Sequence, residues 1–154
     1  MLKKFIDICA AEKIFDGCGK VLIAVSGGAD SLALAELLIN SRQRFKLEVV
    51  IAHFEHGLRG QASLDDADFV KTFAKERDIN FIGGQGDVKQ FATENKISIE
   101  TAARILRYEF LSKLGFDAIA LAHHADDQAE TILMRLLRGA TSAWIGRASC
   151  RERV

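Results

Sequence analysis

Four short apolar runs, separated by longer segments with the apolar spacing of helices, most limit how this chain can fold. Each run has the length and composition of a buried strand. Strands that alternate with helices in this way form a parallel sheet with helices on both faces, an α/β fold. We expect strands over Val21–Val25, Leu47–His53, Asn80–Ile82 and Ala118–Ala122. We expect helices over Leu2–Phe15, Ser31–Ile39, Ser63–Arg77, Val88–Asn95, Ser98–Leu114 and Asp126–Arg138.

Short local motifs predict where some of these elements begin and end. Ser63, with Asp66 after it at capping-box spacing, predicts the start of a helix. Gly83, Gly84 and Gly86 predict a loop directly after the third strand. The third strand is therefore expected to be short.

The composition is that of one globular domain. The 154 residues are 49% hydrophobic and 27% charged, and the formal net charge is zero. A neutral chain lacks the basic surface with which proteins hold nucleic acid, so we expect these residues alone to bind nucleic acid weakly or locally. Cys9, Cys18 and Cys150 form neither a close pair nor a metal-ligand spacing. We expect reduced thiols, with Cys9 and Cys18 buried as small apolar side chains.

The sequence contains no candidate membrane span and no candidate secretion signal. Its longest apolar runs are far too short to cross a bilayer. The N-terminal segment reaches Asp7 and Glu12 too early to contain the apolar core of a signal peptide. We therefore expect a cytoplasmic protein without membrane contact.

The first expected strand runs directly into Ser26-Gly-Gly-Ala-Asp-Ser31, which then opens a helix. Two glycines allow a tight turn and a close approach of backbone N–H groups to an anion. The helix N-terminus adds donors and the positive end of its dipole, and Ser26 and Ser31 add hydroxyl groups. Open α/β sheets bind ligands at such carboxyl ends of strands. The segment predicts a phosphate-binding loop, and because no Gly-Lys-Ser/Thr follows, it is not a Walker loop.

Asp30 lies within this loop, where its carboxylate would repel phosphates unless a cation separated them. A Mg²⁺ ion bound to carboxylate and phosphate oxygens would remove the repulsion, which makes Asp30 a candidate metal ligand. The same residues also fit a simpler structure, in which Asp30 caps the helix and Gly27 and Gly28 form an ordinary turn.

Ser-Gly-Gly-x-Asp-Ser after a strand resembles the PP-loop of the N-type ATP pyrophosphatases, which split ATP into AMP and pyrophosphate. Three further segments resemble the tRNA(Ile)-lysidine synthetases of that superfamily, in the same order and with similar spacing. They are Ala52–Gly60 (AHFEHGLRG), Ala103–Phe110 (ARILRYEF) and Ala122–Gly139, which contains HHADDQAET. The resemblance covers approximately residues 1–143 and implies a Rossmann-like PP-loop fold. Glu55 departs from the family pattern, in which small or amide residues are commoner.

The resemblance implies a ligase that forms a carbon–nitrogen bond. Its substrates would be ATP, L-lysine and a tRNA(Ile) with a CAU anticodon, with Mg²⁺ as cofactor. ATP would adenylate O2 of the wobble cytidine, and the lysine ε-amine would then displace AMP to give lysidine, with pyrophosphate as the other product.

The family's functional residues carry over by position. The residues implied to bind ATP are Ser26, Gly27, Gly28, Ala29, Asp30 and Ser31 around the phosphates, Ala52 and His53 at the adenine, and Arg59 at a phosphate. The residues implied in lysine recognition and catalysis are Arg107, His123, Asp127 and Glu130, together with Asp30. Asp127 and Glu130 share one face of the expected helix, where they could hold the ammonium groups of lysine or take a proton from its amine.

Structural alternatives exist for most of these side chains. Asp127 and Glu130 also fit a solvated helix face, and His53 and His56 fit ordinary strand ends. The arginines of the 103–110 segment could form surface ion pairs with Glu100 and Glu109, and its Tyr108 and Phe110 could simply be core residues.

Two other functions remain open. A related tRNA cytidine thiolase would add sulfur, and would be marked by a Cys-x-x-Cys pair, which this sequence lacks. A non-catalytic ATP-binding module would bind ATP without turnover.

Residues 145–154 continue no pattern of the preceding sequence and match one reading frame of a common sequencing adapter. We expect them to be a non-native tail from adapter read-through, although a natural basic tail is the alternative. Residues 1–144 are then part of a PP-loop catalytic domain whose tRNA-binding parts are missing, so we expect this chain alone to have little activity.

Overall fold

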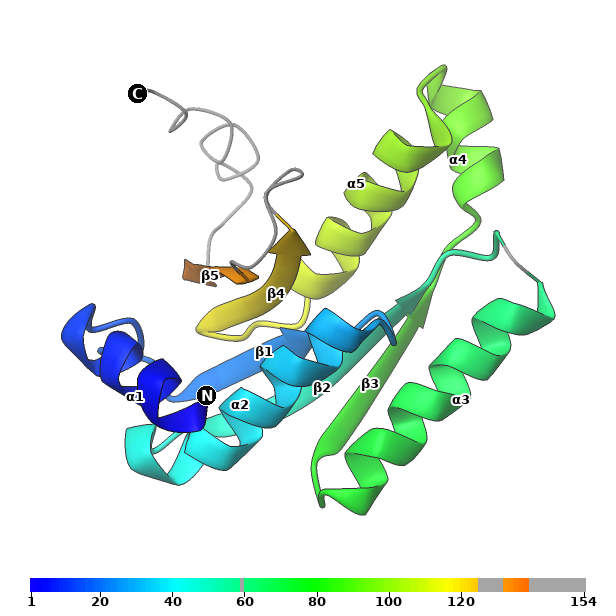
Figure 1. The fold of residues 1–154 in the computed structure, drawn as a ribbon. Helices are drawn as coiled ribbons and strands as arrows, with labels where there is room; N and C mark the ends of the chain where they lie inside the picture. Colours follow the sequence, from blue (N-terminus) through cyan, green and yellow to red (C-terminus); the bar gives the residue numbers. More distant parts are fainter. Residues whose placement is uncertain (59, 125–131, 139–154) are drawn as a thin grey trace.

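A computed structural model describes residues 1–58, 60–124 and 132–138 of the chain. These residues contain one five-stranded sheet with the order β3-β2-β1-β4-β5 (Figure 1). The strands are β1 (Lys20–Ala24), β2 (Glu48–Glu55), β3 (Asn80–Gln85), β4 (Ala118–His124) and β5 (Ile132–Arg138). The first four run parallel, and β5 pairs with β4 in the antiparallel direction. The predicted parallel α/β sheet is confirmed, with one antiparallel strand at its edge.

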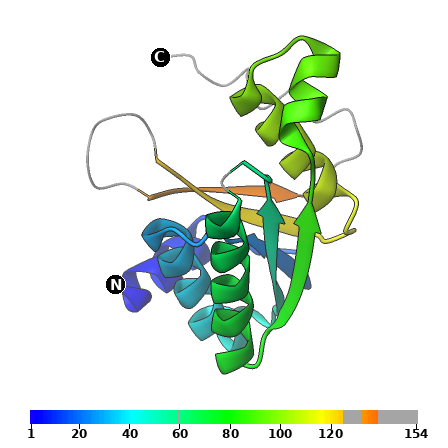
Figure 2. The ribbon, with the colours of Figure 1, turned by 90° about the vertical axis from the view of Figure 1, so that its right-hand side faces the viewer.

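Helices cover both faces of this sheet, as predicted (Figure 2). The helices are α1 (Leu2–Ala11), α2 (Ala29–Phe45), α3 (Gln61–Glu76), α4 (Val88–Asn95) and α5 (Ile99–Ser112). α1, α2 and α3 lie on one face and α5 lies on the other, with α4 packed against α5. None of the helices in the described part of the chain has the length and apolar character that a membrane crossing requires.

The central strand β1 is apolar from Val21 to Ala24 because both of its faces are buried there. Val21 and Ile23 belong to the cluster under α1, α2 and α3, whereas Leu22, between them, belongs to the cluster under α5. This alternation follows from the two-residue period of a strand. Cys9 is 1% exposed in the first cluster, where burial raises the pKa of its thiol to about 11. Cys18 is only half-buried against the same cluster, so the prediction of a buried apolar side chain is confirmed for Cys9 and not fully for Cys18.

Three sequence predictions about local structure are wrong. The helix expected over Asp126–Arg138 is the strand β5 from Ile132 onward, while residues 125–131 lie outside the described part. A short apolar run does not distinguish a helix from a strand, and here its backbone groups pair with the open edge of β4. The predicted helix start at Ser63 is also wrong. α3 begins two residues earlier, at Gln61, and its N-cap is Gly60.

The third error concerns the glycines after the third predicted strand. Gly83 and Gly84 continue β3, paired with His53 and Phe54 of β2, instead of forming a loop. Gly84 has a packing reason to lack a side chain, because a Cβ there would lie 2.5 Å from Cε2 of Phe110 on α5. The strand therefore runs further toward the edge at which ligands bind in α/β sheets.

Asp117 joins the start of β4 to the start of β1. Its Oδ2 accepts hydrogen bonds from the backbone N–H groups of Gly19 at 2.9 Å and Lys20 at 2.8 Å. The bond from Gly19, then that from Lys20, lowers the pKa of this carboxyl below its ordinary value of 3.8. Both bonds favour the charged form, so the carboxylate stabilises the fold above the ordinary pKa and loses that contribution as pH falls through the folded-state pKa.

An Asp117→Asn variant should therefore lose part of the acid sensitivity of the wild-type chain. Thermal unfolding should show a smaller decrease in Tm between about pH 5 and pH 2 for the variant, because its amide does not titrate. Asp68→Asn, on the exposed side of α3, is the matched control and should keep the wild-type decrease. Equal pH profiles for the two variants would contradict this role of Asp117.

Candidate functional site

The carboxyl ends of three parallel strands meet at one edge of the sheet. β1 lies between β2 and β4, and the chain order places β2 on one side of β1 and β4 on the other. This reversal of strand order is a topological switch point, outside which open α/β sheets bind their ligands. The segment 25–28 leaves β1 at this point and leads into α2.

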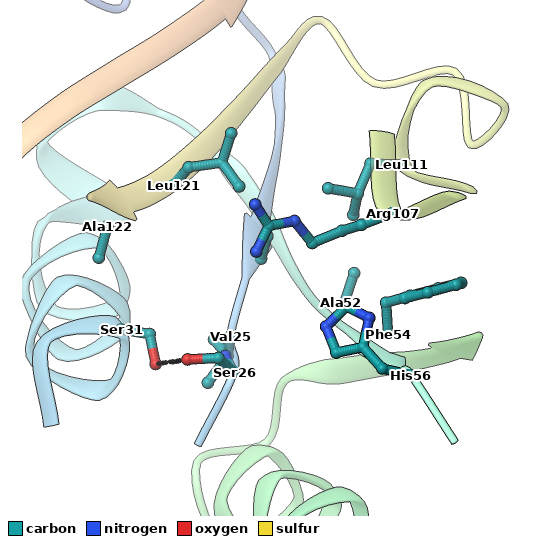
Figure 3. A pocket seen from close by; sticks show the side chains of 11 residues that line it. Val25, Ser26, Ser31, Ala52, Phe54, His56, Arg107, Leu111, Leu121 and Ala122 are labelled. Carbon is teal, nitrogen blue, oxygen red and sulfur yellow. Dashed lines mark hydrogen bonds between the residues drawn. The ribbon is translucent and has the colours of Figure 1, made fainter. Parts of the chain in front are cut away.

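Two serines fold the loop between β1 and α2. The buried Ser31 hydroxyl donates to the carbonyl oxygen of Gly28 at 2.8 Å and accepts from the N–H of Ser26 at 3.2 Å. Because its proton is used in this way, the Ser26 hydroxyl donates across the 3.2 Å between the two Oγ atoms (Figure 3). Ser26 Oγ in turn accepts from the N–H of Gly28 at 3.4 Å. These bonds hold the loop in one shape before any ligand arrives.

The backbone of the loop fits an anion site. Gly27 has φ +93°, in the region that favours glycine, and Gly28 is the N-cap of α2 with φ −74° and ψ 156°. The N–H groups in the first turn of a helix have no partner within the helix, and the helix dipole places partial positive charge beside them. The loop and the 17 residues of α2 thus form a site suited to phosphate.

His53 and Ala52 fasten this loop to β2. The buried His53 ring donates from Nδ1 to the carbonyl oxygen of Val25 at 2.8 Å, and the N–H of Val25 donates to the carbonyl oxygen of Ala52 at 2.8 Å. The alternative reading of His53 as a strand-end structural residue therefore agrees with its position. The predicted contacts of Ala52 and His53 with adenine stay predictions.

A pocket opens beside the loop, between the ends of β1, β2 and β4 and the helix α5 (Figure 3). Ser26 and Ser31 lie at one side of it, Phe54 and His56 lie at another, and the Arg107 guanidinium lies at its middle. The remaining lining residues are Ala24, Val25, Ala52, Leu111, Leu121 and Ala122. Apolar walls with a few convergent polar groups are typical of a small-molecule site.

The structure brings two of the predicted site regions, Arg107 and the Ser26–Ser31 loop, to one pocket. It adds His56 and Phe54, neither of which was among the predicted site residues. No strand pattern in the sequence identified them, because the strand was expected to end at His53 and His56 follows the end of β2.

Two polar atoms in this pocket lack partners. His56 Nδ1 and Arg107 Nε are buried, and neither makes a hydrogen bond to a residue that the structure describes. Burial is the largest effect that lowers the pKa of His56, followed by the charge of Arg107 and then His53, while Glu55 opposes them. The imidazole is therefore neutral at pH 7.

The neighbours of Arg107 on α5 have structural roles. Tyr108 and Phe110 pack in the cluster under α5, which confirms the core alternative for both. Arg107 and Arg104 each lie 5.6 Å from the centre of the Tyr108 ring. Glu109 pairs with Lys113 at 3.8 Å, so the alternative in which Glu109 pairs with an arginine of α5 does not hold.

A second carboxylate accompanies Asp30 near the loop. A Cβ on Gly27 would lie 3.8 Å from Oδ1 of Asp66 on α3. The sequence predicted Asp66 only as part of a helix cap. No group of three or more histidine, cysteine, aspartate or glutamate side chains could hold a metal ion within the ranges 1–58, 60–124 and 132–138. Oxygen ligands suit Mg²⁺, so the donor set fits an ion that takes further ligands from phosphate and water.

Several predicted site residues lie where the structure gives no side-chain position. Arg59, Asp127 and Glu130 are outside the described residues, and only the backbone of His123, within β4, is described. Their roles stay predictions. β4 runs parallel to β1 and ends at His124, so its carboxyl end lies at the same edge of the sheet as the switch point.

The comparisons with known proteins agree with this geometry. Residues 3–152 match the model of the PP-loop domain family. The tRNA(Ile)-lysidine synthase of Geobacter sulfurreducens is 44% identical over 144 residues, which are 91% of this chain and 30% of that protein. The corresponding synthase of Geobacillus kaustophilus is 44% identical over 79% of this chain and 27% of its own length. The chain thus spans less than a third of the length of these relatives.

A solved structure shares the fold. The U34-tRNA thiolase NcsA from Methanococcus maripaludis with its [4Fe-4S] cluster matches with a TM-score of 0.57 and 20% identity, over 66% of this chain and 37% of that chain. Identity this low supports the architecture alone. The family match covers nearly the whole chain, and the chain therefore belongs to the PP-loop domain family, with its predicted resemblance to the tRNA(Ile)-lysidine synthetases confirmed by curated relatives at 40–45% identity.

Proposed function

We propose that this chain is the ATP-handling part of a tRNA(Ile)-lysidine synthetase, a ligase that joins L-lysine to the wobble cytidine of a tRNA(Ile) with a CAU anticodon. The observation that carries the proposal is the 44% identity to a curated synthase over 91% of the chain. The preformed phosphate loop at the switch point supports it, because ATP must bind before the cytidine is activated.

In the first step, O2 of cytidine attacks the α-phosphorus of ATP. A bond forms between O2 and phosphorus, the bond to the bridging oxygen breaks, and pyrophosphate leaves with the electron pair. The backbone donors at Gly27, Gly28 and Ala29 and the dipole of α2 stabilise the negative charge on the phosphates. Arg107 extends into the same pocket and adds a permanent positive charge.

In the second step, the ε-amine of lysine attacks C2 of the activated cytidine. The carbon–nitrogen bond forms, the C2–O bond breaks, AMP leaves, and the amine loses a proton. We assign the lysine and its proton to Asp127 and Glu130, with His123 and Arg107 beside them, because these residues match the family's positions. Acidic side chains suit both the ammonium groups and the transferred proton.

Mg²⁺ bound at Asp30 would neutralise phosphate charge and increase the electrophilicity of the α-phosphorus. Asp30 lies in the first turn of α2, and a Cβ at Gly27 would lie 3.8 Å from Oδ1 of Asp66, so these two carboxylates are the candidates to hold such an ion with phosphate oxygens. Arg59, which follows β2, would contact a second phosphate.

A chimeric enzyme tests the proposal. Residues 1–144 replace the corresponding segment of the Geobacillus kaustophilus synthase, which supplies the rest of the length. We expect ATP-dependent incorporation of labelled lysine into a CAU tRNA transcript, with one AMP and one pyrophosphate released per lysine. The Asp30→Asn chimera should react about a hundredfold more slowly. A folded chimera that binds ATP but incorporates no lysine would contradict the proposal and favour a non-catalytic ATP-binding module.

A tRNA thiolase is the other candidate, and the described cysteines do not support it. Cys9 is a buried residue of α1 and Cys18 packs against the same cluster, and neither lines the pocket beside the loop. The thiolase reaction would appear, when the assay is repeated with a sulfide donor, as sulfur incorporation into the tRNA without lysine.

A further inference from the structure

The pocket beside the phosphate loop holds two polar atoms, from two elements, that no described residue satisfies. His56 follows the end of β2, and its Nδ1 is buried without a partner; Arg107 belongs to α5, and its Nε is buried without a partner among the same residues. Both side chains line the pocket, with the guanidinium at its middle (Figure 3). Because buried polar atoms in proteins are normally paired, two such atoms in one pocket indicate a ligand that supplies both partners.

The two atoms have different hydrogen-bonding capacities. Arg107 Nε carries a proton and can only donate. The lowered pKa of His56 keeps its imidazole neutral, and in the tautomer with the proton on Nε2 its Nδ1 can only accept. In that tautomer the pair presents one donor and one acceptor to the same ligand, whereas with the proton on Nδ1 both atoms would donate.

This pattern separates the chemical groups that the proposed reaction contains. Phosphate and carboxylate oxygens only accept, so they would satisfy both atoms if Nδ1 of His56 carried the proton, but would leave Nδ1 unpaired in the tautomer with the proton on Nε2. An ammonium group only donates, and the charge of Arg107 would repel it. A ring nitrogen next to an exocyclic amine offers an acceptor and a donor side by side. Adenine and cytosine both carry this amidine edge.

We propose that His56 and Arg107 together bind the amidine edge of a nucleobase, with His56 Nδ1 accepting from the exocyclic amine and Arg107 Nε donating to the ring nitrogen. The inference rests on the proposed nucleotide function and names the two atoms, His56 Nδ1 and Arg107 Nε, that would recognise the base. The terminal nitrogens of Arg107 stay available for a phosphate.

The walls of the pocket suit a flat base. Ala52 and Leu111 line it, and the rings of Phe54 and His56 meet edge to face with their centres 5.2 Å apart. Ser26 and Ser31 line the same pocket, so a nucleotide with its base here would have its phosphates beside the phosphate loop. Adenine of ATP and the wobble cytosine both carry the amidine edge, and the test has one arm for each base.

The first arm compares ATP with purine riboside 5′-triphosphate, which lacks the 6-amino group, in titration calorimetry of the whole chain. Wild-type protein should bind ATP about ten- to hundredfold more tightly, because the analogue leaves a buried acceptor unpaired. In His56→Ala and in His56→Phe, which keeps a ring without an acceptor, this ratio should fall to about one. His56→Asn, whose side-chain oxygen accepts near the position of Nδ1, should retain most of it.

The second arm uses the chimeric enzyme, whose remaining length comes from the Geobacillus kaustophilus synthase, and compares two CAU anticodon stem–loops, one with cytidine and one with 4-deaminocytidine at the wobble position. If the affinity ratio between the two stem–loops depends on His56, the bound base is cytosine. If the ratio between ATP and its analogue depends on His56, the bound base is adenine. Either result supports the inference. Should His56→Ala not fold, the comparison of His56→Phe with His56→Asn decides.

Unchanged ratios in all His56 variants, with normal ATP and RNA binding, would overturn this inference alone. A folded wild-type chain that binds neither ligand would overturn the proposed function and this inference with it.

Discussion

A Gly27→Ala variant should bind ATP about ten- to hundredfold more weakly than the wild-type chain. Gly27 has φ +93°, which an alanine adopts only at a cost of about 1–3 kcal/mol. The surroundings would accept a methyl group, because the nearest atoms to a Cβ at this position are 3.8 Å away. The effect is thus one of backbone strain, which would move the loop N–H groups away from the phosphates.

Gly28→Ala is the matched control for the backbone strain in this experiment. Gly28 has φ −74°, which any residue adopts, and a Cβ there would meet only Ser26 Oγ, at 3.6 Å. We expect its free energy of unfolding to remain within about 0.5 kcal/mol of wild type, whereas that of Gly27→Ala decreases. Thermal unfolding and ATP titration of both variants provide the measurement. Wild-type ATP affinity in Gly27→Ala would show that the loop shape does not control binding.

A Gly84→Ala variant should lower the free energy of unfolding by about 2–3 kcal/mol. An added Cβ would lie 2.5, 2.6 and 2.7 Å from three ring atoms of Phe110, so the ring must move. Phe110 contacts Phe54, with ring centres 5.6 Å apart, and Phe54 lines the pocket. The substitution therefore disturbs the packing of α5 on β3 as well as one wall of the site. Chemical denaturation with urea measures the change.

Two further variants test whether the loss of stability in Gly84→Ala comes from overpacking against Phe110 or from replacing any glycine of β3. A Cβ at Gly83 would lie 3.3 Å from the outer edge of the Phe81 ring, which can shift, so Gly83→Ala should cost clearly less than Gly84→Ala. Phe110→Leu should reduce the cost of Gly84→Ala, because it removes the clashing ring atoms. Additive effects of Gly84→Ala and Phe110→Leu would contradict this explanation.

Much of the fold follows from local sequence patterns. The four parallel strands and the first five helices lie close to where their periodicity predicts, because both faces of the sheet are buried and strand and helix periods differ clearly. Their ends differ in places: α1 ends at Ala11 instead of Phe15, and α2 extends to Phe45 instead of Ile39. The loop at Ser26–Ser31 was visible as a motif because its chemistry is local to one strand end.

The errors arise where distant residues decide the structure. Gly84 is part of β3 because Phe110, from another element, occupies the space above it, and the spacing of the glycines does not contain that information. The segment Ile132–Arg138 is a strand because it pairs with β4. Arg107 was found by resemblance, whereas His56 became a site residue only when β2 and α5 were placed on either side of one pocket.

The most direct test of the central claim is titration of the whole chain with ATP in the presence of Mg²⁺, with circular dichroism to verify that the protein is folded. The loop between β1 and α2 predicts saturable binding of one ATP per chain, competition by pyrophosphate, and a weaker affinity in Gly27→Ala. A folded chain that shows no saturable ATP binding, or that binds ATP equally well in Gly27→Ala, would contradict the claim that this loop is an ATP site.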